Sequence, residues 1–225
     1  MKKVFCYSGS SNPKSITRRI CSQLLVELNQ LIIEDVKVKI YDGCTTQILP
    51  VKNADSFFLQ DNLDDTDPMK IIKKDILNSQ IIILGSPVYF HNVSGNMKNF
   101  IDQLSYMTHL FPLIERKVTG VIVVCGSYYG SDEVVKYLMD FEEHLGLGNI
   151  NTIVYNSNRM SYQELRKRIT STSLKVSQAV NKGIVKHSDE QINTYNNYFN
   201  YYTSLDTNTK ETHYWSKRKR LHKTK

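Results

Sequence analysis

Cysteine is scarce in this sequence, and long apolar runs are absent. Four cysteines occur among the 225 residues, at Cys6, Cys21, Cys44 and Cys125, and none forms a Cys-x-x-Cys pair. Such wide spacing disfavours a disulfide framework and is typical of reduced, cytosolic chains. No apolar run reaches the roughly 18 residues that a membrane-spanning helix needs, and the run after Met1 is too short for a signal peptide. The sequence therefore predicts a soluble, cytoplasmic protein with no membrane partner.

Several motifs that define common enzyme classes are also missing. The chain has no Gly-x-Ser-x-Gly and no Gly-x-x-x-x-Gly-Lys-Ser/Thr sequence, which argues against a hydrolase elbow and a P-loop NTPase. His109, His144 and His187 are scattered without the spacing of metal ligands, so we expect no metal site.

Positive charge is in excess, and it gathers near the C-terminus. The formal net charge is +7, and residues 186–225 hold eight Lys and Arg against four Asp and Glu. The run 217–220 is basic and follows Tyr214 and Trp215, a combination found at nucleic-acid sites. Because this run is short and terminal, we expect a solvated tail without a nucleic-acid partner. The chain is divided into a domain over 1–185 and a polar, basic extension over 186–225, a helix or an arm.

Apolar runs alternate with helical spacing along residues 1–185. Patterns typical of strands cover 4–7, 35–41, 81–84, 118–124 and 150–155, and within 35–41 the apolar residues alternate with polar ones. Apolar residues recur at helical spacing over 16–28, 68–78, 97–104, 134–145 and 165–180. Strands that alternate with helices favour an α/β fold with a parallel sheet, and right-handed crossovers place helices on both faces. We predict a doubly wound five-stranded sheet of order 2-1-3-4-5, with a ligand beyond the ends of strands 1 and 3.

The loop after the first strand has the composition of a phosphate site. Residues 8–17 are rich in small hydroxyl side chains and lead directly into a helix. The helix N-terminus attracts anions, and the hydroxyls of Ser10, Ser15 and Thr17 can donate to phosphate oxygens. Lys14 or Arg18 could balance the charge. An ordinary turn with Ser15 as the helix cap explains the same residues, so both interpretations stay open.

The loop after the third strand could hold a planar ring. It begins Gly85-Ser86-Pro87 and continues with Tyr89 and Phe90, whose flat side chains suit a ring system. The backbone of residues 88–93 could then bond the polar edge of that ring. A plain loop whose two aromatic side chains pack on the core fits the composition equally well.

The whole segment 85–102 carries a resemblance to a known family. Its sequence Gly-Ser-Pro-Val-Tyr-Phe-x-x-Val-Ser-Gly-x-Met-Lys-x-Phe-Ile-Asp resembles the signature of the NAD(P)H-dependent FMN reductases, closest to the iron–sulfur flavoprotein branch. The loop over residues 9–15 is similar to that family's FMN phosphate loop. The resemblance covers roughly residues 1–180 and implies a flavodoxin-like fold, non-covalent FMN and NAD(P)H as co-substrate. It also implies a homodimer or homotetramer.

The resemblance assigns the cofactor contacts by position. It implies that the FMN phosphate is held by Ser10, Asn12, Ser15, Ile16 and Thr17, although the family often has a basic residue where Asn12 stands. The isoalloxazine ring would lie against Pro87, Val88, Tyr89, Phe90 and Val93. A third loop, with Gly126, Ser127, Tyr129 and Gly130, would close the other side of the ring; a plain turn is the alternative.

One feature of the iron–sulfur branch is missing. That branch carries a compact cysteine cluster after the second strand, where this chain has only Cys44. A [4Fe–4S] cluster needs about four thiolates, and Cys6 and Cys125 fall on expected buried strands. We therefore predict no iron–sulfur cluster, and suggest that residues 42–67 form a lid over the flavin.

These patterns favour an FMN-dependent NAD(P)H oxidoreductase that passes a hydride to a quinone, a flavin or another small acceptor. The hydride step requires no acid or base from the protein, so no catalytic residue is assigned; we interpret His91 as a solvated loop residue. The main alternative is a flavodoxin-type electron carrier without NAD(P)H activity, although such carriers tend to be acidic. A binding module that has lost its flavin is the third hypothesis.

Overall fold

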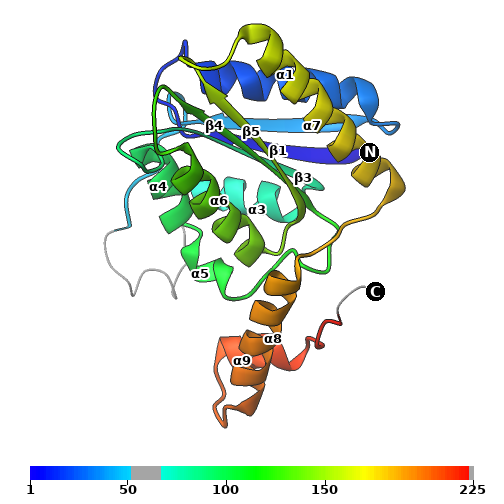
Figure 1. Cartoon of the computed structure of the whole chain (residues 1–225). Helices are drawn as coiled ribbons and strands as arrows, with labels where there is room; N and C mark the ends of the chain where they lie inside the picture. The colour runs from blue at the N-terminus through cyan, green and yellow to red at the C-terminus, as the bar shows by residue number, and fades with distance from the viewer. Residues whose placement is uncertain (52–66, 223–225) are drawn as a thin grey trace.

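One parallel sheet of five strands forms the centre of the molecule. The computed structural model describes residues 1–51 and 67–222. The strands are β1 (Lys2–Ser8), β2 (Val36–Asp42), β3 (Ile81–Pro87), β4 (Thr119–Gly126) and β5 (Gly148–Asn156). Their order is β2-β1-β3-β4-β5, and every neighbouring pair is parallel (Figure 1). The predicted doubly wound order is confirmed.

Helices cover both faces of the sheet, as Figure 1 shows. One face carries α1 (Ile16–Leu31) and α7 (Tyr162–Lys182), and the other carries α3 (Pro68–Leu77), α4 (Gly95–Asp102), α5 (Ser105–Thr108) and α6 (Ser131–Leu145). Side chains alternate along β1, so that Val4 and Cys6 pack in the core under α1 while Phe5 and Tyr7 pack in the core under α4. This two-sided burial explains why the central strands read as unbroken apolar runs.

The start of α3 shows how local sequence fixes an element. Asp67 accepts a hydrogen bond from the backbone N–H of Met69 at 2.8 Å, and Pro68 occupies the first helical position. The helix start predicted from the acidic cluster and Pro68 is therefore confirmed at Asp67. The lid predicted over residues 42–67 falls mainly on 52–66, which lie outside the described residues, as do the other aspartates of the cluster.

The C-terminal extension contains helices that dock on the main domain. Helices α8 (Asp189–Ser204) and α9 (Lys210–Ser216) project beyond the end of the sheet (Figure 1). Trp215 is fully buried there and packs with Tyr195 and with Phe111, which comes from the segment after α5. The indole is therefore buried in a core of its own and does not offer a face for stacking on a nucleic-acid base.

Candidate functional site

The carboxyl ends of the strands surround a cavity of about 250 Å³, which we call the first cavity. Its lining residues follow β1, β3, β4 and β5: Ser10, Asn12, Lys14, Ser15, Ile16, Thr17, Pro87, Val88, Tyr89, Cys125, Gly126, Ser127, Tyr155 and Ser157. It lies where the chain passes from β1 to one face of the sheet and from β3 to the other. This is the switch point at which doubly wound folds bind their ligands.

One end of the first cavity is built from the first turn of α1. Ser15 caps this helix, since its Oγ accepts a hydrogen bond from the N–H of Thr17 at 3.1 Å. Ser10 accepts from the N–H of Asn12 at 3.3 Å. Both hydroxyls keep a proton to donate to a ligand. The hydroxyl of Thr17 is fully buried; it makes no well-aligned hydrogen bond among the described residues, but it lies close enough to the Cys125 thiol to oppose the rise that burial causes in the pKa of that thiol. A donor without a well-aligned acceptor at a helix N-terminus fits an anionic ligand.

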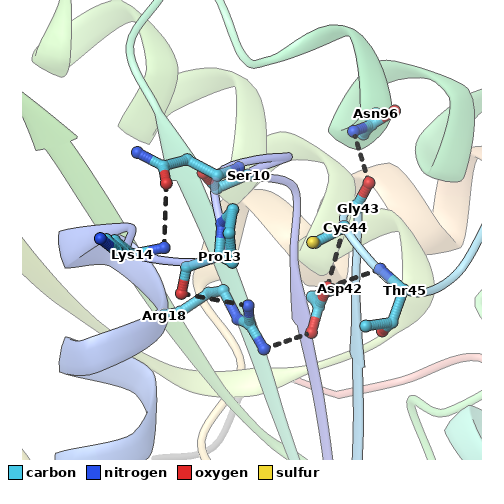
Figure 2. Close-up of polar contacts among 10 residues, drawn as sticks. Ser10, Pro13, Lys14, Arg18, Asp42, Gly43, Cys44, Thr45 and Asn96 are labelled. Carbon is cyan, nitrogen blue, oxygen red and sulfur yellow. Dashed lines mark hydrogen bonds and ion pairs between the residues drawn. The ribbon is translucent and has the colours of Figure 1, made fainter.

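A buried carboxylate holds this loop in place. Asp42, at the end of β2, pairs with Arg18 at 3.0 Å and accepts hydrogen bonds from the N–H groups of Cys44 and Thr45 at 2.8 and 2.9 Å. Arg18 also donates to the carbonyl of Pro13 at 3.3 Å, so its guanidinium lies between the two loops (Figure 2). The charge of Arg18 is therefore already matched inside the protein.

Lys14 is the cation that lines the first cavity. Its ammonium group forms no ion pair among the described residues, and its backbone N–H donates to the side chain of Asn12 at 2.9 Å. The sequence left Lys14 and Arg18 as alternatives for balancing a phosphate. The ion pair of Arg18 leaves Lys14 as the group for that role.

Ser94 connects the loop after β1 to the segment that follows β3 through hydrogen bonds. This residue caps α4, and its Oγ donates to the carbonyl of Gly9 at 2.6 Å, while its N–H donates to Ser86 Oγ at 3.1 Å. A Cβ atom at Gly9 would lie 2.5 Å from Ser94 Oγ and 2.6 Å from Met97 Cβ, so only glycine permits this approach. The loops after β1 and β3 are thus held at a fixed separation.

The loop after β3 ends in a tight turn. Tyr89 and Asn92 exchange two backbone hydrogen bonds at 2.9 and 3.1 Å, and Phe90 and His91 between them have φ values of +47° and +61°. Positive φ at both central residues is the geometry of a type I′ turn. Phe90 is 98 % exposed as a result, and Val93 is buried in the core on the α4 side. Neither side chain lines the first cavity, although the sequence placed both against the ring.

The loop after β4 is shared between two cavities. Gly126 and Ser127 line the first, whereas Tyr129 and Gly130 line a second cavity of about 430 Å³. The other predicted contacts, at 10, 12, 15–17 and 87–89, all line the first cavity.

Sequence reasoning missed Cys125, Tyr155 and Ser157 as lining residues of the first cavity. Burial raises the pKa of the Cys125 thiol to about 12, so this side chain stays neutral at physiological pH. Tyr155 and Ser157 lie at alternate positions near the end of β5. The signal that could have found them is that position itself, because strand ends face the ligand in this kind of fold.

The described residues contain neither a helix suited to a membrane nor a group of potential metal ligands. No helix within 1–51 and 67–222 is both long and apolar enough to cross a membrane. In the same part of the chain, His, Cys, Asp and Glu do not gather in threes to form a possible metal site. Cys44 is exposed, and the other three cysteines are buried.

Together, the sheet order and the cavity at its switch point define a doubly wound protein of the flavodoxin-like class. Within that class, the sequence profile of the NADPH-dependent FMN reductases matches residues 2–160. The chain belongs to this family, as the motif at 85–102 indicates.

Individual relatives agree with this placement. An iron–sulfur flavoprotein from Archaeoglobus fulgidus is 30 % identical over 112 residues, which are 50 % of this chain and 46 % of that protein. The match thus spans about half the length of the curated relative. An FMN-dependent NADH-azoreductase from Bacillus anthracis, solved with FMN, superposes with a TM-score of 0.62 at 11 % identity, covering 80 % of this chain and 99 % of that one. An apo NADH:FMN oxidoreductase gives 0.59 at 13 % identity, covering 85 % and 94 %. These two structures confirm the flavodoxin-like fold.

Proposed function

We propose that FMN binds in the first cavity and that the chain passes a hydride from NAD(P)H, through that flavin, to a small acceptor such as a quinone or a free flavin. The observation that carries the proposal is the cavity at the switch point, whose one end is the N-terminal turn of α1 with Ser10, Ser15 and the unpaired cation Lys14. When bound, FMN supplies the hydride chemistry, and the protein supplies orientation and electrostatics.

The phosphate end of the site uses groups that the fold has left free. Ser10, Ser15 and Thr17 direct hydroxyl donors at the phosphate, and Ile16 begins the helix whose N-terminus favours an anion. The ammonium group of Lys14 balances the charge. Asn12 adds a neutral amide where relatives often have a base, so Lys14 supplies the cation instead.

The ring end of the site excludes water and fixes orientation. Pro87 and Val88 form one wall; the N–H of Val88 donates to the carbonyl of Cys125 at 2.8 Å, so this wall is tied to β4. Gly126 and Ser127 continue this wall, since Gly126 lies next to Val88, and the backbone N–H of Ser157 donates to the carbonyl of Gly126 at 3.0 Å. Because no side chain here must exchange a proton for hydride transfer, we assign no catalytic acid or base.

We also propose that the protein forms a homo-oligomer. Tyr89 and Phe90 are exposed beside the first cavity, and Tyr128 is exposed on the next loop. Exposed aromatic side chains suit a subunit interface, which favours a homodimer or homotetramer. We also propose that the protein holds no iron–sulfur cluster; iron and sulfide analysis of anaerobically purified protein tests this, and four irons per chain would contradict it.

The first test is the visible spectrum of the purified protein after soaking with FMN, followed by NADPH or NADH without oxygen. Flavin bands that bleach within seconds support the oxidoreductase. Bound FMN that stays oxidised favours the flavodoxin-type carrier. No bound flavin at all overturns the proposal and leaves a binding module.

A variant of Lys14 tests where the phosphate lies. Loss of a hydrogen bond to a charged group costs about 1.5–3 kcal/mol. Lys14→Gln should therefore raise the Kd for FMN about tenfold or more, and leave the Kd for riboflavin, which has no phosphate, unchanged. Arg19→Gln is the matched control, because Arg19 is exposed on α1 and does not line the cavity. Equal FMN affinity in both variants would refute the placement of the phosphate.

A further inference from the structure

A ridge of backbone separates the second cavity from the first, because the same loop and strand end line both. The ridge consists of the loop 126–130 and the end of β5, where the side chain of Asn156 donates to the carbonyl of Tyr128 at 3.1 Å. Successive residues of β5 alternate between the two sides: Tyr155 and Ser157 line the first cavity, and Asn156 lines the second. At about 430 Å³, the second cavity falls within the roughly 300–1,000 Å³ of small-molecule sites.

The second cavity combines flat rings with cations. Tyr128 and Tyr129 line it and are each 70 % exposed. The guanidinium of Arg159 lies 5.5 Å from the centre of the Tyr129 ring. Arg159 and Arg168 both line the cavity, and neither forms an ion pair with any described residue. The site thus offers stacking surfaces next to two unpaired guanidinium groups.

Acidic groups are present too, and they limit what the cavity can bind. Glu133 is paired with His91, whose Nδ1 lies 3.2 Å from the carboxylate. Asp132 also lines the cavity and has no ion pair among the residues described. Glu164 does not line the cavity, but it lies near Arg168. The pKa of Glu164 is lowered mainly by its hydrogen bonds with Ser161, and to a smaller extent by the charge of Arg168. A bare anion gains nothing from Asp132, whereas a ligand with both hydroxyl groups and phosphates uses both kinds of side chain.

We propose that the second cavity binds the adenosine phosphate half of the nicotinamide dinucleotide. The adenine ring stacks on Tyr128 and Tyr129, a ribose hydroxyl donates to Asp132, and Arg159 and Arg168 bind the phosphates. The nicotinamide then reaches over the ridge to the first cavity. This inference rests on the proposed function, because it takes the first cavity as the flavin site.

The test is a calorimetric titration of ADP into the purified protein, which needs neither flavin nor turnover. We expect ADP to bind, and Arg159→Gln and Arg168→Gln each to weaken it about tenfold or more, since each removes a bond to a charged group. The matched control is Arg166→Gln, which changes an exposed arginine of α7 outside the cavity and should bind ADP as the wild type does. Inorganic pyrophosphate, which has no adenosine, should bind far more weakly than ADP.

A kinetic measurement separates this inference from the function on which it rests. The preference for NADPH over reduced nicotinamide mononucleotide, as a ratio of kcat/KM values, should fall about tenfold in Arg159→Gln. The inference is overturned if the wild-type protein does not bind ADP, or if Arg159→Gln binds ADP as tightly as Arg166→Gln does. In either case, bleaching of bound FMN would still support the oxidoreductase. Arginine-dependent ADP binding in a protein that takes up no FMN, even after soaking, supports the second cavity as a nucleotide site and refutes the flavin function.

Discussion

Thr17 offers a test in which stability and affinity should change in opposite directions. Its hydroxyl is buried in the first turn of α1 beside the Cys125 thiol, with no well-aligned hydrogen bond among the described residues, and Thr17 lines the first cavity. Thr17→Val keeps the shape of the side chain and removes only the hydroxyl. Leaving a buried polar group unpaired costs about 1–3 kcal/mol. The variant without FMN should therefore have a higher free energy of unfolding by about 1 kcal/mol or more.

The bound state should respond in the reverse sense. If the hydroxyl of Thr17 donates to the FMN phosphate, Thr17→Val loses a charge-assisted hydrogen bond of about 1.5–3 kcal/mol. The Kd for FMN should then rise roughly tenfold to a hundredfold. Urea unfolding followed by circular dichroism measures the stability of the apoprotein, and quenching of FMN fluorescence measures the affinity.

Thr119 provides the matched control. It is also fully buried, its hydroxyl has no partner among the described residues, and it is the first residue of β4, at the edge of the sheet opposite the first cavity. Thr119→Val should raise the stability of the apoprotein by a similar amount and leave the affinity for FMN unchanged. The reasoning is refuted if both variants bind FMN equally well, or if Thr17→Val makes the apoprotein less stable.

Two further predictions concern buried residues that do not line the first cavity. Glu142 is fully buried, neither carboxylate oxygen has a partner in the described part of the chain, and burial raises its pKa well above the usual value of 4.5. The folded state must therefore keep it protonated, so stability should fall by up to about 1.4 kcal/mol per pH unit as pH rises above 4.5. In Glu142→Gln, the free energy of unfolding should lose this pH dependence, which corresponds to on the order of one proton. Urea unfolding between pH 5 and pH 8 measures it, and equal pH dependence in the variant and the wild type would contradict the prediction. Trp215→Ala should cost about 3–5 kcal/mol and speed hydrogen exchange in α8 and α9, without a change in the Kd for FMN. A matching loss of FMN affinity would show that the extension shapes the first cavity.

Local sequence predicted the elements because burial and capping are local signals. Val4 to Tyr7 form a buried strand, and apolar spacing from Ile16 to Leu28 forms one face of α1. Ser15 was open to two interpretations, as a helix cap or as a phosphate ligand. It caps α1 and also lines the first cavity, so the two roles are compatible. The sheet order was predicted from the doubly wound pattern that five strands alternating with helices suit, and the handedness of crossovers placed helices on both faces.

The sequence by itself determined which loops meet at the switch point, because strand ends of a parallel sheet lie at one edge whatever their side chains. Only the tertiary structure decided which side chains of those loops enter the cavity. Positive φ at Phe90 turns that ring into solvent, packing under α4 buries Val93, and the ridge after β4 sends Tyr129 into the second cavity. Arg18 pairs with Asp42, which lies 24 positions further along the chain. This ion pair leaves Lys14, rather than Arg18, to balance the charge of a phosphate. Such choices depend on backbone dihedrals and on contacts between distant segments, and no local pattern of residues records them.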